Sequence, residues 1–93
     1  MRTIIIFMQD KKDKFLFELA RIVKKYRERA NLSINQASHE IDLSKSIWSV
    51  IEQGKRDPQL STLWKISEVL NIPLSLLIKD MKIELGQDFF IEN

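Results

Sequence analysis

Hydrophobic residues recur with helical spacing through most of this chain. In residues 13–31 they are separated by steps of four, three, four and four, which places them on one helical face; they are Phe15, Leu19, Ile22, Tyr26 and Ala30. Asp13 precedes this stripe and is predicted to cap the helix, while Asn31 can adopt the left-handed conformation that ends a helix. The pattern predicts one long amphipathic helix.

Two short helices are predicted next from local start and stop signals. Ser33 and Gln36 have the Ser-x-x-Gln form of a capping box, which opens a helix over residues 33–41. Ser44 is expected to cap a third helix, and Gly54 to end it. A turn of only a few residues therefore joins the second helix to the third.

Two more helices are predicted after Pro58. The fourth follows an amphipathic stripe made of Leu60, Leu63, Trp64, Ile66, Val69 and Leu70. Residues 71–73, Asn-Ile-Pro, break this helix, and Pro73 suits the first turn of a fifth helix over residues 74–78. With two glycines and two prolines in the whole sequence, the chain is predicted to be mostly helical.

The two ends of the chain have a strand-like pattern instead. Residues 2–8 are rich in β-branched side chains, and apolar and charged side chains alternate over residues 81–85. A predicted turn at residues 86–88 leads into the apolar residues 89–91. These segments are consistent with a small sheet, within one chain or between two. The alternative is that Met8 is the natural start and the residues before it are a frayed extension.

Composition narrows the class of protein. With 44% hydrophobic and 30% charged residues, the 93-residue chain suits one soluble domain. The absence of cysteine excludes disulfides and thiolate metal sites, and fits a reducing compartment. The apolar run at residues 4–8 is too short for a signal peptide or a membrane span. The protein is therefore expected to be cytoplasmic.

Charge is unevenly distributed along the sequence. Residues 11–79 carry 13 Lys/Arg against 8 Asp/Glu, whereas residues 80–93 carry one lysine against four acidic residues. A basic body with an acidic tail is compatible with a polyanionic partner, although a solvated mixed surface is the commoner interpretation.

The predicted helix after Ser44 has one apolar and one polar side. On a helical wheel Ser44, Ile47, Trp48, Ile51 and Glu52 fall together, and Lys45, Ser46, Ser49, Val50 and Gln53 fall opposite them. Core packing therefore explains Ile47, Trp48 and Ile51. It does not explain Val50, which lies in the middle of the polar side.

The spacing of the second and third helices is that of a helix-turn-helix, whose second helix enters the DNA major groove. Residues 32–78 resemble the phage-repressor (Cro/repressor, XRE-type) family. The resemblance rests on four features in one order: Leu-Ser before the second helix, Ser at the start of the third, Ile-Glu-x-Gly-Lys-Arg-x-Pro at 51–58, and Leu-Asn-Ile-Pro at 70–73. It implies an all-α, five-helix repressor-like fold.

The resemblance also implies roles for individual residues. Base edges are expected to be contacted by Lys45, Ser46, Ser49 and Val50. Phosphates are expected to be contacted by Asn35, Gln36, Ser44, Gln53, Lys55 and Arg56, although a solvated turn is the alternative for the last two. Arg27 matches a family arginine that pairs with the glutamate represented here by Glu52.

This chain departs from the family pattern in the second and third helices. Ile34 stands where family members usually have a phosphate-contacting glutamine, and the neighbouring Asn35 is the candidate substitute. Ala37 and Ser38 stand where the family commonly has Leu and Ala, while Trp48 replaces an aliphatic residue. This resembles an exchange of volume, which leaves an indole N–H in need of a partner.

The sequence thus predicts a sequence-specific DNA-binding transcriptional regulator, with repression as the expected mode, acting as a homodimer on a near-palindromic operator. Its expected parts are an N-terminal extension (1–12), the DNA-binding domain (13–79) and a C-terminal tail (80–93). Dimerisation is assigned to Leu74, Leu77, Ile78, Phe89, Phe90 and Ile91. The alternative is an antitoxin-like protein-interaction module whose acidic, aromatic tail binds a partner protein.

Other chemistries have little support in the sequence. His39 is the only histidine, which excludes histidine metal clusters, and an exposed surface position is its expected place. The sequence has neither a Gly-rich phosphate loop nor a Gly-x-Ser-x-Gly motif. No enzymatic activity, cofactor or metal site is predicted.

Overall fold

The computed structural model describes residues 10–92, which form five helices and no strand. The helices are α2 (Lys11–Arg29), α3 (Ile34–Glu40), α4 (Lys45–Glu52), α5 (Leu60–Val69) and α6 (Leu74–Leu85). The predicted all-α fold is therefore confirmed. The strand expected at residues 2–8 and the alternative start at Met8 lie outside the described residues.

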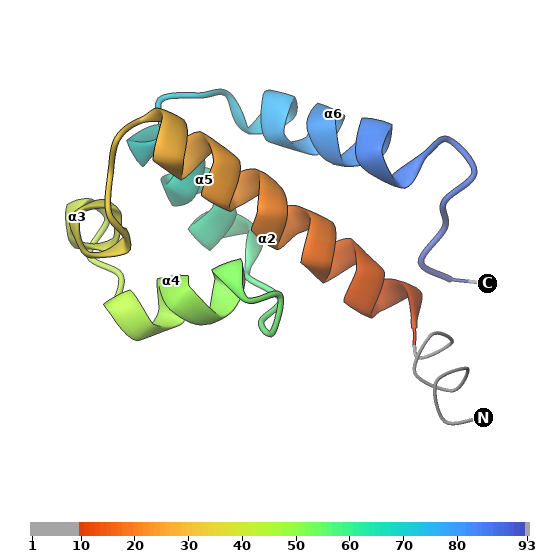
Figure 1. Ribbon diagram of the computed structural model, residues 1–93, viewed down its shortest axis with the longest axis horizontal. Coiled ribbons are helices and arrows are strands. Elements are labelled where there is room, and N and C mark those ends of the chain that lie inside the picture. The colour runs from red at the N-terminus through yellow and green to blue at the C-terminus, as the bar shows by residue number, and fades with distance from the viewer. Residues whose placement is uncertain (1–9, 93) are drawn as a thin grey trace.

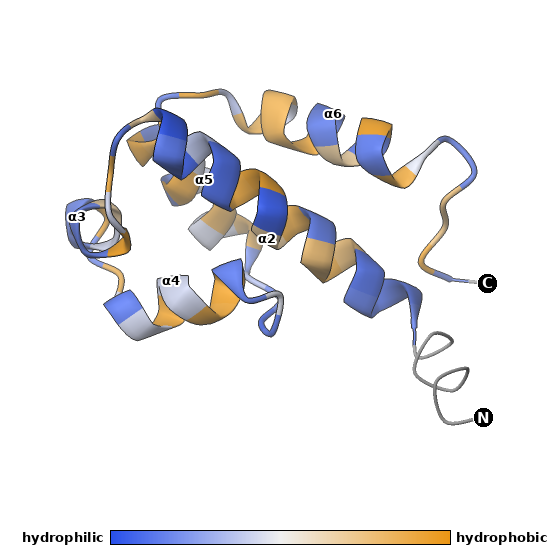
Figure 2. Ribbon diagram, viewed as in Figure 1, coloured by the Kyte–Doolittle hydropathy of each residue, from blue (hydrophilic) through white to orange (hydrophobic). Residues whose placement is uncertain are grey.

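The long helix α2 organises the fold. Figure 1 shows α6 running along one side of α2 and α4 along the other, with α5 behind and α3 at one end. Helix α2 packs on both α4 and α6, α3 packs on α4 and α5, and α5 packs on α6. The apolar sides of these helices meet in one core (Figure 2), formed by Leu16, Leu19, Ile22, Val23, Ala37, Trp48, Ile51, Ile66, Leu70, Leu77 and Met81.

Helix starts follow the predicted caps, with one correction. The capping box of α3 is complete, because the Gln36 N–H donates to Ser33 Oγ (3.0 Å) and the Ser33 N–H donates to Gln36 Oε1 (2.8 Å). Ser44 Oγ accepts from the Ile47 N–H (3.2 Å) and caps α4. The cap of α2 is Asp10 instead of Asp13, so this helix begins before its apolar stripe.

Four helices end in the same way, with a left-handed residue just past the helix. These residues are Asn31 (φ 59°), Asp42 (φ 53°), Gly54 (φ 73°) and Asn71 (φ 57°). At each end two backbone N–H groups return to the last helical carbonyls; after α3, for example, Asp42 donates to His39 and Leu43 to Ser38. This is the Schellman arrangement. It makes the turn between α3 and α4 short and well hydrogen-bonded.

The end of α6 differs from the prediction. The helix continues through residues 81–85, which were predicted to be strand-like, and so crosses the expected domain boundary at residues 79–80. Met81 is buried and Ile83 is exposed, because residues 77, 81 and 85 continue the core-facing helical stripe. Apolar residues at positions 81, 83 and 85 fit the period of a strand, whereas the helix places only positions 81 and 85 on its core-facing stripe. A turn follows at Gly86, but residues 89–92 form no strand.

The apolar stripe predicted for α5 is only partly buried. Ile66 and Leu70 are buried, but Leu60 and Trp64 are 67% and 58% exposed. The core of the folded chain therefore takes only part of the apolar surface of α5. Trp64 remains on the outside of the molecule.

Candidate nucleic-acid interface

Helix α4 has one side in the core and one side in solvent. Trp48 and Ile51 are buried, and Ile47 packs against them at the edge of the core. On the other side Lys45, Ser46 and Gln53 are exposed, while Ser49 and Val50 are half-buried. Val50 is not among the partly buried residues that pack against the core.

The outward side chains of α4 are partly ordered by one another. The Gln53 amide Nε2 donates to Ser49 Oγ (3.1 Å), and Ser44 Oγ lies 3.3 Å from Ser46 Oγ. The nearby cations Lys45, Lys55 and Arg56 are all exposed, and no carboxylate of residues 10–92 lies within ion-pair distance of them. This side of the molecule therefore offers hydroxyl and amide groups beside positive charge.

A buried polar network holds α4 against α2. Arg27 Nε and Nη2 donate to the two carboxylate oxygens of Glu52 (2.6 and 2.9 Å), and Arg27 Nη1 donates to the Leu32 carbonyl (2.8 Å). The two side chains are 11% and 6% exposed. The bidentate hydrogen bond raises the pKa of Arg27 above its ordinary value. This is the pair that the family resemblance predicts.

Trp48 joins the same network. Its indole N–H donates to Glu52 Oε2 (2.6 Å), one helical turn away. The sequence indicated that this N–H needs a partner without naming one, although the i, i+4 spacing is a usable signal. Ala37 and Trp48 lie in the same core, as the proposed exchange of volume requires.

A second polar cluster joins α2 to α6, and sequence analysis missed it. The Tyr26 hydroxyl donates to Asp80 Oδ2, and Lys25 Nζ lies 3.5 Å from the same oxygen. The hydrogen bond raises the pKa of Tyr26, and the same bond, with the charge of Lys25, lowers the pKa of Asp80. Adjacent residues of α2 thus connect to α4 on one side and to α6 on the other.

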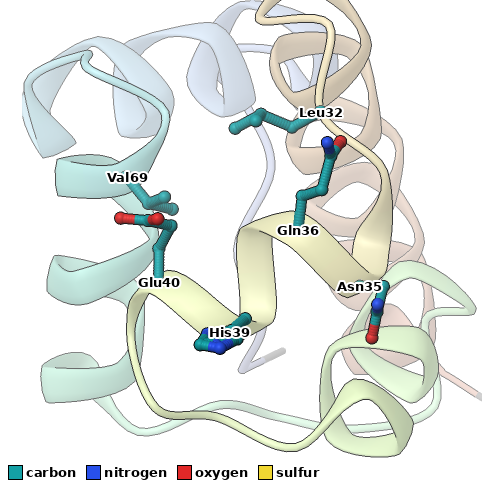
Figure 3. A pocket seen from close by; sticks show the side chains of 6 residues that line it. All are labelled: Leu32, Asn35, Gln36, His39, Glu40 and Val69. Carbon is teal, nitrogen blue, oxygen red and sulfur yellow. The ribbon is translucent and has the colours of Figure 1, made fainter.

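Helix α3 separates two open hollows. One, of about 520 Å³, is lined by Leu32, Asn35, Gln36, His39, Glu40 and Val69 (Figure 3). The other, of about 530 Å³, lies over the turn to α4 and is lined by Asn35, Ser38, His39, Asp42, Leu43, Ser44 and Lys45. Asn35 and His39 are exposed and line both hollows.

The residues assigned to dimerisation divide into two groups. Leu77 is fully buried in the core of the single chain, because it faces inward from α6, and so it cannot contact a partner. Leu74 and Phe89 are half-buried, and Ile78, Phe90 and Ile91 are exposed. Trp64, which belongs to the apolar stripe of α5, is exposed and lines an apolar hollow together with Ile78.

The helix-turn-helix family HTH_3 matches residues 23–77, from the middle of α2 into α6. The chain belongs to this family. Relatives of the helix-turn-helix domain include the control protein C.MunI of a Mycoplasma species, which is 39% identical over 83% of this chain and 100% of its own length. The transcriptional regulator SutR of Escherichia coli is 32% identical over 64% of this chain but only 34% of its own length.

Solved structures share the fold of this helix-turn-helix domain. An HTH_3 family transcriptional regulator from Vibrio cholerae has a TM-score of 0.72 at 24% identity, over 88% of this chain and 46% of its own. A point mutant of the restriction-modification controller protein C.Esp1396I has a TM-score of 0.71 at 17% identity, over 81% of this chain and 95% of its own. The same controller, as a tetramer with its natural 35-base-pair operator, has a TM-score of 0.64 at 21% identity, over 72% of this chain and 93% of its own.

Neither a metal site nor a membrane span is found in the part of the chain that the structure describes. Residues 10–92 contain no group of three or more His, Cys, Asp or Glu side chains placed to hold a metal ion. None of the described helices is long and apolar enough to cross a membrane.

Proposed function

We propose that this protein is a DNA-binding transcriptional regulator that uses α4 as its recognition helix. The observation that carries the proposal is the outward side of α4, where polar side chains stand beside three exposed cations without carboxylate partners among the described residues. A helix with this character, presented by a short turn after α3, fits the major groove. The family and the regulators related to the chain support the same function.

The proposed contacts fall into two groups. Ser46, Ser49 and Val50 are proposed to face base edges, and Lys45 to contact a guanine or a neighbouring phosphate. The residues proposed to contact phosphates are Asn35, Gln36, Ser44, Gln53, Lys55 and Arg56. Gln36 caps α3 through its side-chain oxygen, which leaves its amide N–H groups for DNA. The Ser44 and Ser46 hydroxyls share one hydrogen bond, which leaves one of their two protons for DNA. Genome-wide recovery of DNA bound to the protein tests this function. Recovery of a near-palindromic sequence is expected, and random recovery would contradict it.

The proposed regulator acts as a homodimer through a surface on α5, α6 and the tail. Two apolar hollows share Ile78 there. One, of about 770 Å³, includes Trp64, Ile72 and Leu74, and the other, of about 500 Å³, includes Leu85 and residues 89–91. We call this the α5–α6 surface. Both signs of charge border it, with Lys79 and Lys82 near Glu68 and Glu92, so it is suited to pairing with a second copy of itself.

Replacing Ile78 with glutamate is expected to make the protein monomeric at micromolar concentration, because a carboxylate would be buried without a partner at the centre of the surface. Ile83→Glu is the matched control, since Ile83 is on α6 and 63% exposed but lines neither hollow. Sedimentation velocity distinguishes the two variants. If Ile78→Glu stays dimeric, the α5–α6 surface is not the interface.

Removing the tail tests its share of the interface, and the cut must follow Leu85, because α6 includes the buried Met81. Weaker dimerisation is expected after this cut.

Trp64 gives a second measurement of dimerisation. Trp48 is buried in the single chain, so a change in tryptophan emission on dilution should come from Trp64. The change should disappear in Trp64→Phe.

Val50 is proposed to contact the C5-methyl group of a thymine in each half-site, because valine has no donor or acceptor and this methyl is the apolar feature of the major groove. Operators with uracil at that position lack only the methyl. Burial of one methyl contributes about 0.8 kcal/mol, so a dimer should bind the thymine operator roughly tenfold more tightly. Val50→Ala should shrink this preference and leave the melting temperature nearly unchanged. A Val50→Ala protein that mainly loses stability would place Val50 in the core.

A further inference from the structure

The hollow over the turn between α3 and α4 brings together side chains from both helices. Asn35 and His39 are one helical turn apart on α3, and Lys45 is on the first turn of α4. Figure 3 shows Asn35 and His39 on the side of α3 toward this turn, with Gln36 and Leu32 on the other side. An amide, an imidazole and an ammonium group therefore border one open space of about 530 Å³.

We propose that this hollow receives a phosphate of the DNA backbone, and that His39 contacts this phosphate in its protonated form. The inference rests on the proposed DNA-binding function and adds a residue to it. Amide and ammonium N–H groups donate to phosphate oxygens at any neutral pH. A protonated imidazole adds both a donor and a positive charge, whereas the neutral ring adds no charge.

The charged groups around His39 determine how much its protonation strengthens the binding of a phosphate in the hollow. On its own helix Glu40 is the next residue, on the turn Asp42 lines the same hollow, and on α4 the facing charge is Lys45. From α5 only Val69 reaches the neighbouring hollow. Asp42 opposes a phosphate in the hollow, while Lys45 favours it. Protonation of His39 shifts this local balance by one positive charge.

DNA affinity should consequently rise as the pH falls. A histidine imidazole gains its proton as the pH falls from about 8 to 5, a range in which ordinary Asp, Glu and Lys side chains keep their charge. The sequence has one histidine and no cysteine. The pH step is therefore expected to depend on a single side chain, which one substitution can remove.

The experiment measures affinity for the recovered operator by fluorescence anisotropy at pH 5.5 and pH 7.5, at one ionic strength. One exposed charge contact changes affinity about threefold, so a dimer should bind about tenfold more tightly at pH 5.5. The log–log salt slope should steepen by about 2, for two more phosphates. Circular dichroism at both pH values checks that the fold is unchanged.

Three variants make the test specific. His39→Gln should bind weakly at both pH values, and His39→Lys should bind tightly at both, so that each loses the step. Asp42→Asn should bind more tightly at both pH values and keep the rise in affinity at low pH. Asparagine tolerates the left-handed conformation of residue 42, so this variant should keep the fold. A wild type without a pH step, or a step that persists in His39→Gln, overturns the inference and leaves the proposed function standing. No DNA binding by wild type at either pH overturns both.

Discussion

Replacing Glu52 with alanine is expected to lower the free energy of unfolding by about 3–5 kcal/mol, because Arg27 would remain in a largely buried place without its carboxylate. The substitution would remove three hydrogen bonds at once, because Glu52 accepts two from Arg27 and one from the Trp48 indole. For a domain of this size the melting temperature should fall by roughly 15–30 °C. Thermal unfolding followed by circular dichroism measures the change.

Glu84→Ala is the matched control. Glu84 also pairs with an arginine on α2, Arg21 (2.9 Å), but both side chains are 47% exposed. An exposed pair of this kind contributes about 0–1 kcal/mol. The double variant Arg27→Ala/Glu52→Ala should cost less than the sum of the two single changes, because no charge is left unpaired. A Glu52→Ala protein that melts within a degree or two of wild type would contradict the structural role of this pair.

Binding to the operator is expected to weaken steeply with salt, with a log–log slope on the order of −5 to −7 for a dimer. The slope corresponds to about three or four phosphate contacts in each subunit, each of which releases counterions from DNA. Lys45, Lys55 and Arg56 are the main candidates for these contacts, because they are exposed and have no carboxylate partner among residues 10–92.

A matched pair of lysine substitutions assigns the contacts to one side of the molecule. Lys55→Ala should reduce the magnitude of the slope by about 2 in a dimer. Lys65→Ala removes the same charge from an exposed position on α5 and should leave the slope unchanged. A flat salt response of the wild type, or equal affinity for any polyanion, would count against operator binding.

The candidate interface was predictable from the sequence to the extent that it depends on one helix. The wheel separated Trp48 and Ile51 from Lys45 and Ser46, and the structure buries the first two and exposes the last two. The helical wheel did not identify Asn35, His39 and Lys45 as neighbours around one hollow. That grouping depends on the angle between α3 and α4, which is set by the way both helices pack in the core.

Features that depend on a few neighbouring residues could be predicted from the sequence. Ser33 and Gln36 form their capping box and Asn31 ends α2 in the left-handed conformation, because these arrangements require hydrogen bonds only between residues up to five positions apart. The family was likewise recognisable from the order of short motifs. Local signals and the apolar stripes therefore predicted all five described helices, apart from the start of α2 and the end of α6.

Which part of the apolar surface is covered depends on the packing of the helices against one another. Leu77 is buried and Trp64 is exposed, although both belong to amphipathic helices with more apolar residues than one core can accept. The end of α6 was decided in the same way, because Met81 lies in the core that the helices share. Hydrophobic burial has no direction along the chain, so a sequence states how much apolar surface a helix has, while packing selects the part that leaves water.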